Sequence, residues 1–282
     1  MPPVWKIKHG GKGEMKQDVD CIHLVDSALS GGRITTEIID NIDSFNADSL
    51  KVSGLRQDTF EYLVAQYGNR FRSIFFWKCP GVEDLTPLED LSQIESIRFF
   101  WNTKAIRFWD MYKTPKLKSL EFSDFTRLRD LGDLSSAEGL EHLSFGNSPS
   151  GKTSIVSLIP IASLQSLVNL SLNPTKIDDG QVSPISLLPN LKFLNFSSRL
   201  FRFEQIAWLA ARLPRQVECD YLRPFVSLRA GTLNDADVMI LGKGKPFLNS
   251  SRDAQRIKRY VDEFERLVDL FRKNPAEPEP RK

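Results

Sequence analysis

Apolar side chains recur along the middle of the chain with a period of 23 to 27 residues. Each of six successive registers has apolar residues at offsets 0, 3 and 5 and a further marked position at offset 8. Offsets 3 and 5 are two residues apart, which is the alternation of a short strand with one buried face. The pattern predicts a stack of identical supersecondary units. The registers begin at Phe71, Ile94, Leu117, Leu140, Leu167 and Leu191.

A second set of apolar residues lies between the predicted strands and is spaced by three. Spacing of three indicates 3₁₀ or short helical turns rather than a second strand in each unit. Each unit is therefore predicted to be one short strand followed by a returning turn. The clearest intervals hold Val82, Leu85, Leu88 and Leu91, then Leu128, Leu131 and Leu134, then Leu158, Ile161 and Leu164, and last Ile206, Leu209 and Leu213.

This pattern resembles the leucine-rich repeat family, with its motif L-x-x-L-x-L-x-x-N/C-x-L. The resemblance covers roughly residues 71–214, and its period is similar to the short class of about 23 residues. It implies an α/β solenoid that is curved, with a parallel sheet on the concave face and 3₁₀ or short helical turns on the convex face. Cys79 and Asn102 occupy the N/C position, whereas Phe125, Ser148, Thr175 and Arg199 depart from it. The departures predict an irregular ladder of side chains along the loops.

A repeat stack needs capping segments because its end units would otherwise expose the core. We expect a flexible N-terminus at residues 1–16 and an N-terminal cap at 17–70, with a degenerate first repeat at Leu50-Lys51-Val52 and a helix at 59–67. Residues 215–273 are expected to form the C-terminal cap, with an amphipathic helix after a capping box made by Ser250 and Asp253. Residues 274–282 are predicted to be a disordered tail.

Residues at offsets 2, 4 and 6 are expected to project from the concave face, opposite the core. The first strands place large aromatic side chains there, and aromatic and arginine residues dominate binding hot spots. Two interpretations stay open: the aromatic side chains bind a partner, or the N-terminal cap or residues 103–113 cover them. The candidate partner-binding residues are Phe75, Trp77, Arg98, Phe100, Trp101, Glu121, Asp124 and His142.

Charge and composition narrow the function classes. Lys plus Arg is 38 and Asp plus Glu is 36, so a net charge of +2 gives no general steering toward nucleic acid or membranes. Three scattered cysteines make neither a disulfide framework nor a cysteine-rich metal site. The absence of paired flanking cysteines argues against the extracellular repeat classes. With no signal-peptide pattern and no run of about 18 apolar residues, we expect a cytoplasmic protein without a membrane partner.

One segment matches a nucleotide-binding motif. Residues 146–153 fit G-x-x-x-x-G-K-[ST], in which Gly151, Lys152 and Thr153 would hold phosphate and Mg²⁺. The segment begins inside a predicted repeat strand, and Pro160 interrupts the helix that a phosphate loop requires. A polar insertion is therefore the favoured interpretation, and a cofactor is not expected.

No other pattern indicates chemistry. The three histidines show no metal-ligand spacing, and no nucleophile–base arrangement stands out. The sequence therefore predicts a non-enzymatic protein-recognition module, with an inhibitor or immunity-type protein as one form. Nucleotide binding by residues 146–153 is the alternative, and nucleic-acid binding through the basic ends is the weaker one.

Overall fold

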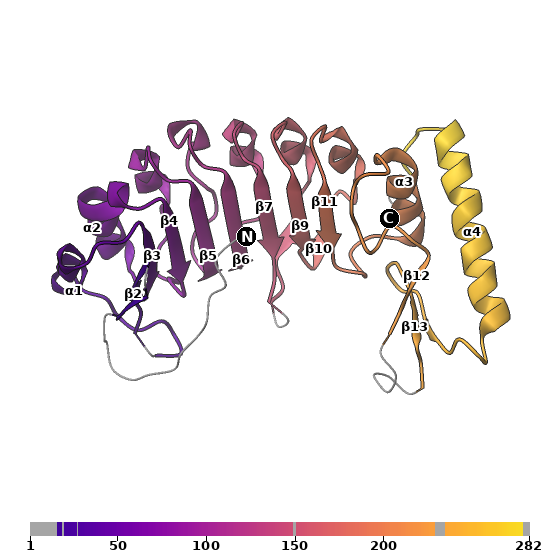
Figure 1. The fold of residues 1–282 in the computed structure, drawn as a ribbon, viewed down its shortest axis with the longest axis horizontal. Coiled ribbons are helices and arrows are strands. Elements are labelled where there is room, and N and C mark those ends of the chain that lie inside the picture. The colour runs from indigo at the N-terminus through magenta and orange to yellow at the C-terminus, as the bar shows by residue number, and fades with distance from the viewer. Residues whose placement is uncertain (1–15, 19, 27, 149–150, 229–234, 279–282) are drawn as a thin grey trace. The chain divides into compact units, whose positions relative to one another are not determined.

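The computed structural model of the chain describes residues 16–18, 20–26, 28–148, 151–228 and 235–278 (Figure 1). It divides into two compact units, residues 1–127 and 128–282. The expected flexible N-terminus, apart from Lys16, lies outside the described residues, as do residues 279–282 of the expected tail.

The first unit is built on a sheet whose strands follow one another in chain order. Strand β1 pairs antiparallel with β2, and every later neighbour is parallel. The degenerate repeat expected at residues 50–52 therefore continues the sheet as β3. The strands are β1 (Lys16–Asp18), β2 (Cys21–Leu24), β3 (Ser49–Ser53), β4 (Ser73–Trp77), β5 (Ser96–Asn102) and β6 (Ser119–Phe125).

Short helices return the chain between these strands. Helix α2 buries Phe60, Leu63 and Val64 and occupies the segment where a helix was predicted. The predicted 3₁₀ turn appears as η3, which has a proline at its second residue and buries Leu88. The helices are α1 (Thr36–Asp40), η1 (Asn41–Ser44), α2 (Gln57–Tyr67), η2 (Gly68–Arg70), η3 (Thr86–Asp90) and η4 (Met111–Lys113).

Phenylalanine rings form the core of the first unit. The rings of Phe76 and Phe99 stack with their centroids 4.9 Å apart, and Phe99 meets Phe125 edge-on at 5.4 Å. Phe108, from residues 103–113, packs against Phe122 at 4.9 Å and is fully buried. This loop therefore packs into the core side of the sheet, and it does not cover the outward aromatic side chains as one interpretation supposed.

The second unit is built from the same kind of repeat, a short strand followed by a 3₁₀ turn. Strands β7, β9 and β11 are parallel neighbours, and 3₁₀ turns return the chain between repeats as predicted. A further pair, β8 and β10, is parallel and two residues long. The elements are η5 (Gly132–Ser136), β7 (His142–Gly146), β8 (Ser154–Ile155), η6 (Ile159–Ser163), β9 (Asn169–Asn173), β10 (Lys176–Ile177), η7 (Ser183–Leu187) and β11 (Phe193–Phe196).

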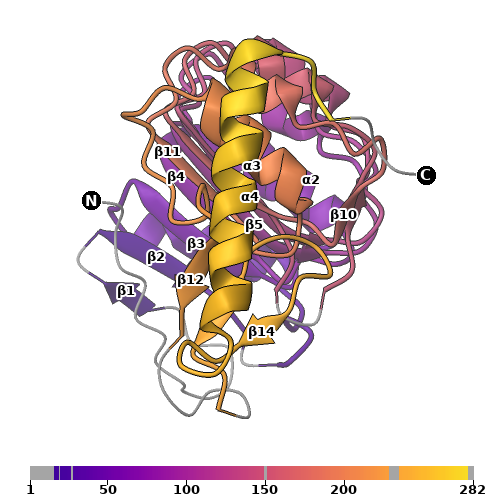
Figure 2. The same cartoon turned by 90° about the vertical axis from the view of Figure 1, so that its right-hand side faces the viewer.

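The last apolar interval forms an α-helix, α3 (Phe203–Arg212), rather than a 3₁₀ turn. It packs against α4 (Ala254–Lys273), which runs along this end of the second unit (Figure 2). Phe203 meets Phe264 edge-on at 5.5 Å, so the predicted amphipathic stripe closes the core. The chain between α3 and α4 forms an antiparallel sheet of β12 (Phe225–Ser227), β13 (Val238–Ile240) and β14 (Phe247–Leu248).

The structure differs from two expectations at this end. The capping box expected from Ser250 and Asp253 does not form, because the N-cap Asp253 makes no side-chain cap hydrogen bond. The expected disordered tail is docked at residues 274–278. Glu277 accepts hydrogen bonds from the backbone N–H groups of Val182 and Ser183, and Trp208 Nε1 donates to the carbonyl of Pro275 at 3.1 Å. No helix of the described residues is long and apolar enough to cross a membrane.

Candidate functional site

The outward face of the first unit is arranged in rows by the strand register. One row runs from Lys51 on β3 through Phe75 on β4 and Arg98 on β5 to Glu121 on β6. The next row runs from Ser53 through Trp77 and Phe100 to Ser123. Parallel strands in register place like positions about 4.8 Å apart. The predicted candidates on β4, β5 and β6 are thereby brought together on one face.

Cations and aromatic rings alternate across this face. Phe75 lies between Lys51 Nζ, 5.4 Å from its ring centroid, and the Arg98 guanidinium carbon, 4.6 Å away. Trp77 lies between Lys51 Nζ at 5.3 Å and Lys78 Nζ at 4.6 Å. Lys78 Nζ is also 5.5 Å from the ring of Trp101. All five pairs lie within the range of favourable cation–π contact. We call these residues the aromatic–cation surface: Lys51, Phe75, Trp77, Lys78, Arg98, Phe100 and Trp101.

The backbone at the ends of these strands is left-handed. Lys78, Trp101 and Asp124 have φ values of 53°, 60° and 57° and occupy the same place in three successive repeats. Left-handed backbone costs about 1–3 kcal/mol for a residue with a side chain, whereas glycine adopts it freely. The equivalent residue in the preceding repeat is Gly54, with φ of 65°. Strain of this kind is typical of functional positions.

Lys51 is the least satisfied charge on the aromatic–cation surface. Its side chain is half-buried, and its ammonium has no hydrogen-bond acceptor or carboxylate partner among the described residues. Burial lowers the pKa of Lys51, and the charge of Arg98 lowers it further, while Cys21 acts in the opposite direction. By contrast, Lys78 Nζ donates to the carbonyl of Leu29.

The acidic side of the surface begins at β6. Glu121 Oε1 lies 3.1 Å from Arg98 Nη2 and forms an ion pair between two half-exposed side chains. Arg98 Nε is buried and has no acceptor among the described residues. Asp124, at the end of the same strand, is 9% exposed. The face therefore changes from cationic to anionic within one strand spacing.

The predicted site residues differ in exposure and in location. Trp77, Phe100 and Trp101 are half-exposed, but Phe75 is only 6% exposed, with Lys51 and Arg98 beside its ring. His142 lies in the second unit, where its Nδ1 is 2.7 Å from the side-chain amide of Asn169.

Sequence reasoning missed Lys51 and Lys78. Both were detectable. Lys51 occupies the outward offset of the degenerate repeat, and Lys78 stands at the same offset as Trp101 and Asp124.

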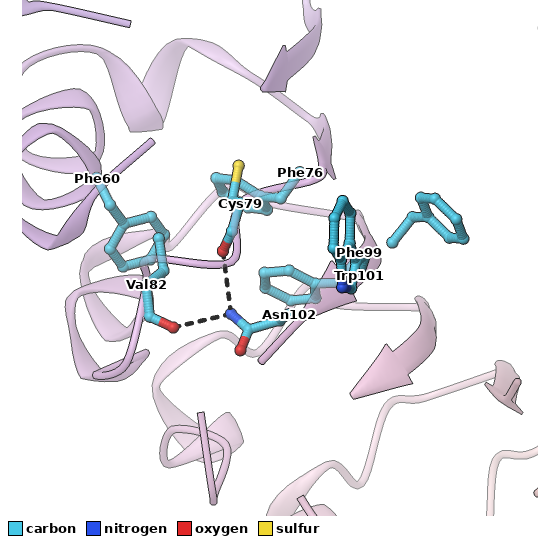
Figure 3. Close-up of a pocket in the computed structure, with 8 residues that line it drawn as sticks. Phe60, Phe76, Cys79, Val82, Phe99, Trp101 and Asn102 are labelled. Carbon is cyan, nitrogen blue, oxygen red and sulfur yellow. Dashed lines mark hydrogen bonds between the residues drawn. The ribbon is translucent and has the colours of Figure 1, made fainter. Parts of the chain in front are cut away.

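The loops at the ends of the strands contain a buried asparagine whose side chain links successive repeats. Buried Asn102 donates from Nδ2 to the carbonyls of Val82 at 2.9 Å and Cys79 at 3.4 Å (Figure 3). Its Oδ1 accepts from the backbone N–H groups of Lys104 and Ala105. One asparagine side chain thus satisfies backbone N–H and C=O groups in the turns of two successive repeats. Each repeat consists of a parallel strand and a 3₁₀ turn. The chain has the leucine-rich repeat fold.

The ladder of hydrogen bonds along these loops is irregular, as predicted. Phe125 takes the asparagine position one repeat after Asn102 and packs into the phenylalanine core. Asn147 supplies the hydrogen bonds in the second unit, where its Oδ1 accepts from Thr153 N at 2.7 Å and its Nδ2 donates to Thr175 Oγ1 at 3.0 Å. Cys79 is fully buried, and this burial raises the pKa of its thiol to about 12, so it packs rather than reacts.

Comparison with known proteins finds likeness at the level of solved structures. No family model and no curated protein sequence matches the chain. An internalin of Listeria monocytogenes superposes with a TM-score of 0.49 and 18% identity, over 67% of this chain and 51% of its own. A leucine-rich repeat protein of Leptospira interrogans superposes with a TM-score of 0.45 and 16% identity, over 66% of this chain and 43% of its own. The chain thus spans about half the length of these two proteins.

The leucine-rich repeat domain of a type III effector is also similar in structure. It superposes with a TM-score of 0.38 and 13% identity, over 71% of this chain and 75% of its own.

Residues 146–153, which match the nucleotide-binding motif, are not followed by the helix that a phosphate-binding loop requires. Residues 149–150 of the motif lie outside the described residues, but Lys152 is exposed and Thr153 is 4% exposed. Thr153 is held by Asn147 and is followed by strand β8, where a phosphate loop requires the first turn of a helix. No group of three metal-ligating side chains occurs among the residues that the structure describes.

Proposed function

We propose that this leucine-rich repeat protein is a non-enzymatic module that binds a partner protein on the outward face of β3–β6. The observation that carries the proposal is the half-exposure of Trp77, Phe100 and Trp101 on one face, beside three cations. Such side chains bury a large area with few rotatable bonds, and they dominate binding hot spots. The left-handed backbone at Lys78 and Trp101 supports the proposal, since a purely structural turn there would favour glycine.

Such a module acts by binding alone: it covers part of the partner's surface and catalyses no reaction. An inhibitor or immunity-type role is the form of the proposal in which the covered surface is a partner's active site. A cytoplasmic location and the absence of a cofactor remain part of the proposal.

The test is affinity capture from native lysate with quantitative mass spectrometry. The wild type is compared with Trp77→Ala/Phe100→Ala/Trp101→Ala and with the control Ile106→Ala/Tyr112→Ala. The control removes side chains that are 54% and 71% exposed in the same unit but lie in the loop that packs on the core side. We expect the triple variant to lose a protein that the wild type and the control retain. Each hot-spot side chain is worth about 2 kcal/mol, or roughly 30-fold in affinity.

Circular dichroism confirms that all three proteins are folded before the comparison. Equal retention by the wild type and a folded triple variant would reject this face as the binding site.

A further inference from the structure

At the centre of the aromatic–cation surface, the positive charge of Lys51 has no carboxylate partner among the residues that the structure describes. Lys51, Lys78 and Arg98 come from three neighbouring strands and alternate with the rings of Phe75 and Trp77. Arg98 has Glu121, and Lys78 has the carbonyl of Leu29, but Lys51 has neither kind of partner among the described residues. An ammonium carries three N–H donors, and partial burial without an acceptor is unfavourable.

We infer that the partner segment bound on this face carries a carboxylate between apolar side chains, and that the carboxylate lies against Lys51. The inference rests on the proposed function. Lys78 has two N–H donors beyond the one used for Leu29, and its Nζ lies 4.6 Å from the ring centroid of Trp77, so it adds positive charge close to the bound segment. The apolar neighbours of the carboxylate would pack on Trp77, Phe100 and Trp101.

The extent of the charge favours a short acidic protein segment over a polyanion. The cations span only β3, β4 and β5, which is about 10 Å across the sheet at the usual strand spacing. Beyond them lies the half-exposed carboxylate of Glu121 on β6. A continuous phosphate backbone would run from the cations onto this acidic group, whereas one carboxylate stops before it. Like charges brought together across an interface are unfavourable.

The aromatic rings also favour a carboxylate with apolar neighbours. A ring face attracts cations, so Phe75 and Trp77 hold Lys51 in place without neutralising it. The charge is therefore positioned before the partner arrives, and little side-chain entropy is lost on binding. A charge-assisted hydrogen bond from a held donor is stronger than one between neutral groups.

The experiment is a selection of random displayed peptides on the full chain, followed by affinity measurement with the enriched synthetic peptide. The variants are Lys51→Gln, Lys51→Glu and Lys51→Arg, with Lys113→Glu as a control of equal charge change on the exposed turn η4. A single-stranded oligonucleotide is measured against the same proteins. We expect enriched peptides with Asp or Glu between large apolar residues. Affinity should fall roughly 10- to 100-fold for Lys51→Gln and further for Lys51→Glu. Lys51→Arg and Lys113→Glu should keep it.

Each other outcome overturns the inference and separates it from the proposed function. Enriched peptides that need Trp77, Phe100 and Trp101 but not the charge of Lys51 would leave the proposed function standing alone. Peptides that bind the triple alanine variant as well as the wild type would remove both. An absence of enrichment would refute an acidic segment as the recognised element and leave the lysate capture to decide the function. Oligonucleotide binding lost in Lys51→Glu would replace the acidic segment with nucleic acid.

Discussion

The two units use the same repeat but finish their strands differently. In the first unit the chain turns through left-handed backbone at Lys78, Trp101 and Asp124, and each turn carries a large or charged side chain. In the second unit strand β7 ends at Gly146, which has a φ of 144°. The outward residues of this unit are mostly small and polar. Side chains at the outward positions do not contribute to the core, so the repeat leaves them free to differ. The comparison shows that the same repeat carries aromatic and charged outward residues in the first unit and mostly small polar ones in the second.

The largest expected loss of stability comes from a substitution at Gly146, where strand β7 of the second unit ends. A Cβ on Gly146 would lie 2.2 Å from the carbonyl carbon of Asn173, and its φ is unfavourable for a side chain. We expect Gly146→Ala to lower the free energy of unfolding by about 3 kcal/mol, measured by urea titration. Gly244→Ala is the control, because Gly244 is also left-handed but has open space around it, and it should cost only about 1 kcal/mol. Equal losses would mean that the close approach of β9 is unimportant.

The next effect compares the two asparagines that satisfy the loops. Asn102 is buried and makes four hydrogen bonds to backbone groups of neighbouring turns. Asn102→Ala should lower the free energy of unfolding by roughly 2 to 3 kcal/mol, since buried backbone groups are left without partners. Asn147→Ala should cost about 1 kcal/mol, because water reaches the half-exposed groups of its loop. A larger loss at Asn147 in the same urea titration would contradict this ordering.

A smaller effect separates stability from recognition in the first unit. Trp101→Gly removes the left-handed strain and the side chain together, whereas Trp101→Ala removes only the side chain. We expect the glycine variant to be about 1 kcal/mol more stable than the alanine variant in thermal or urea unfolding. Both should lose partner binding equally. An alanine variant as stable as the glycine variant would show that the turn stores no strain.

The smallest effect concerns the inserted loop of the second unit. Lys152 is exposed and has no structural role in the turn that Asn147 and Thr153 build. Lys152→Ala should change the free energy of unfolding by less than about 0.5 kcal/mol. Calorimetric titration with Mg²⁺ and ATP or GTP should give no binding heat for the wild type at millimolar nucleotide. Saturable heat that disappears in Lys152→Ala would restore the nucleotide-binding alternative.

Much of the fold was predictable because the repeat constrains local and global structure together. Offsets 3 and 5 had to face a core shared with neighbouring units, so alternation alone placed Ile74 and Phe76 inward and Trp77 outward. Spacing of three predicted the 3₁₀ turns η3, η5, η6 and η7. The same spacing predicted a returning helical segment at α3 but not its length, because contact with α4 stabilises a longer helix with a continuous buried stripe.

The candidate site was predictable only in part. Alternation placed Trp77, Arg98 and Phe100 on one face, but it did not show that cations would cover Phe75. The repeat offsets of Lys51 and Lys78 were visible in the sequence, but their contacts with the rings of Phe75, Trp77 and Trp101 depend on strand register and on left-handed backbone at Lys78. Residues 103–113 contain apolar side chains whose destination was open, and packing against Phe122 and Phe125 decided it.

The sequence by itself determined the repeat, its strands and the faces that they present, because period and alternation act between near neighbours. Only the tertiary structure decided the alternation of Lys51, Phe75 and Arg98, the strained turns at Lys78 and Trp101, and the docking of Glu277 on the second unit. These features join residues from different repeats or from distant segments. Their geometry exists only after neighbouring strands have paired in register.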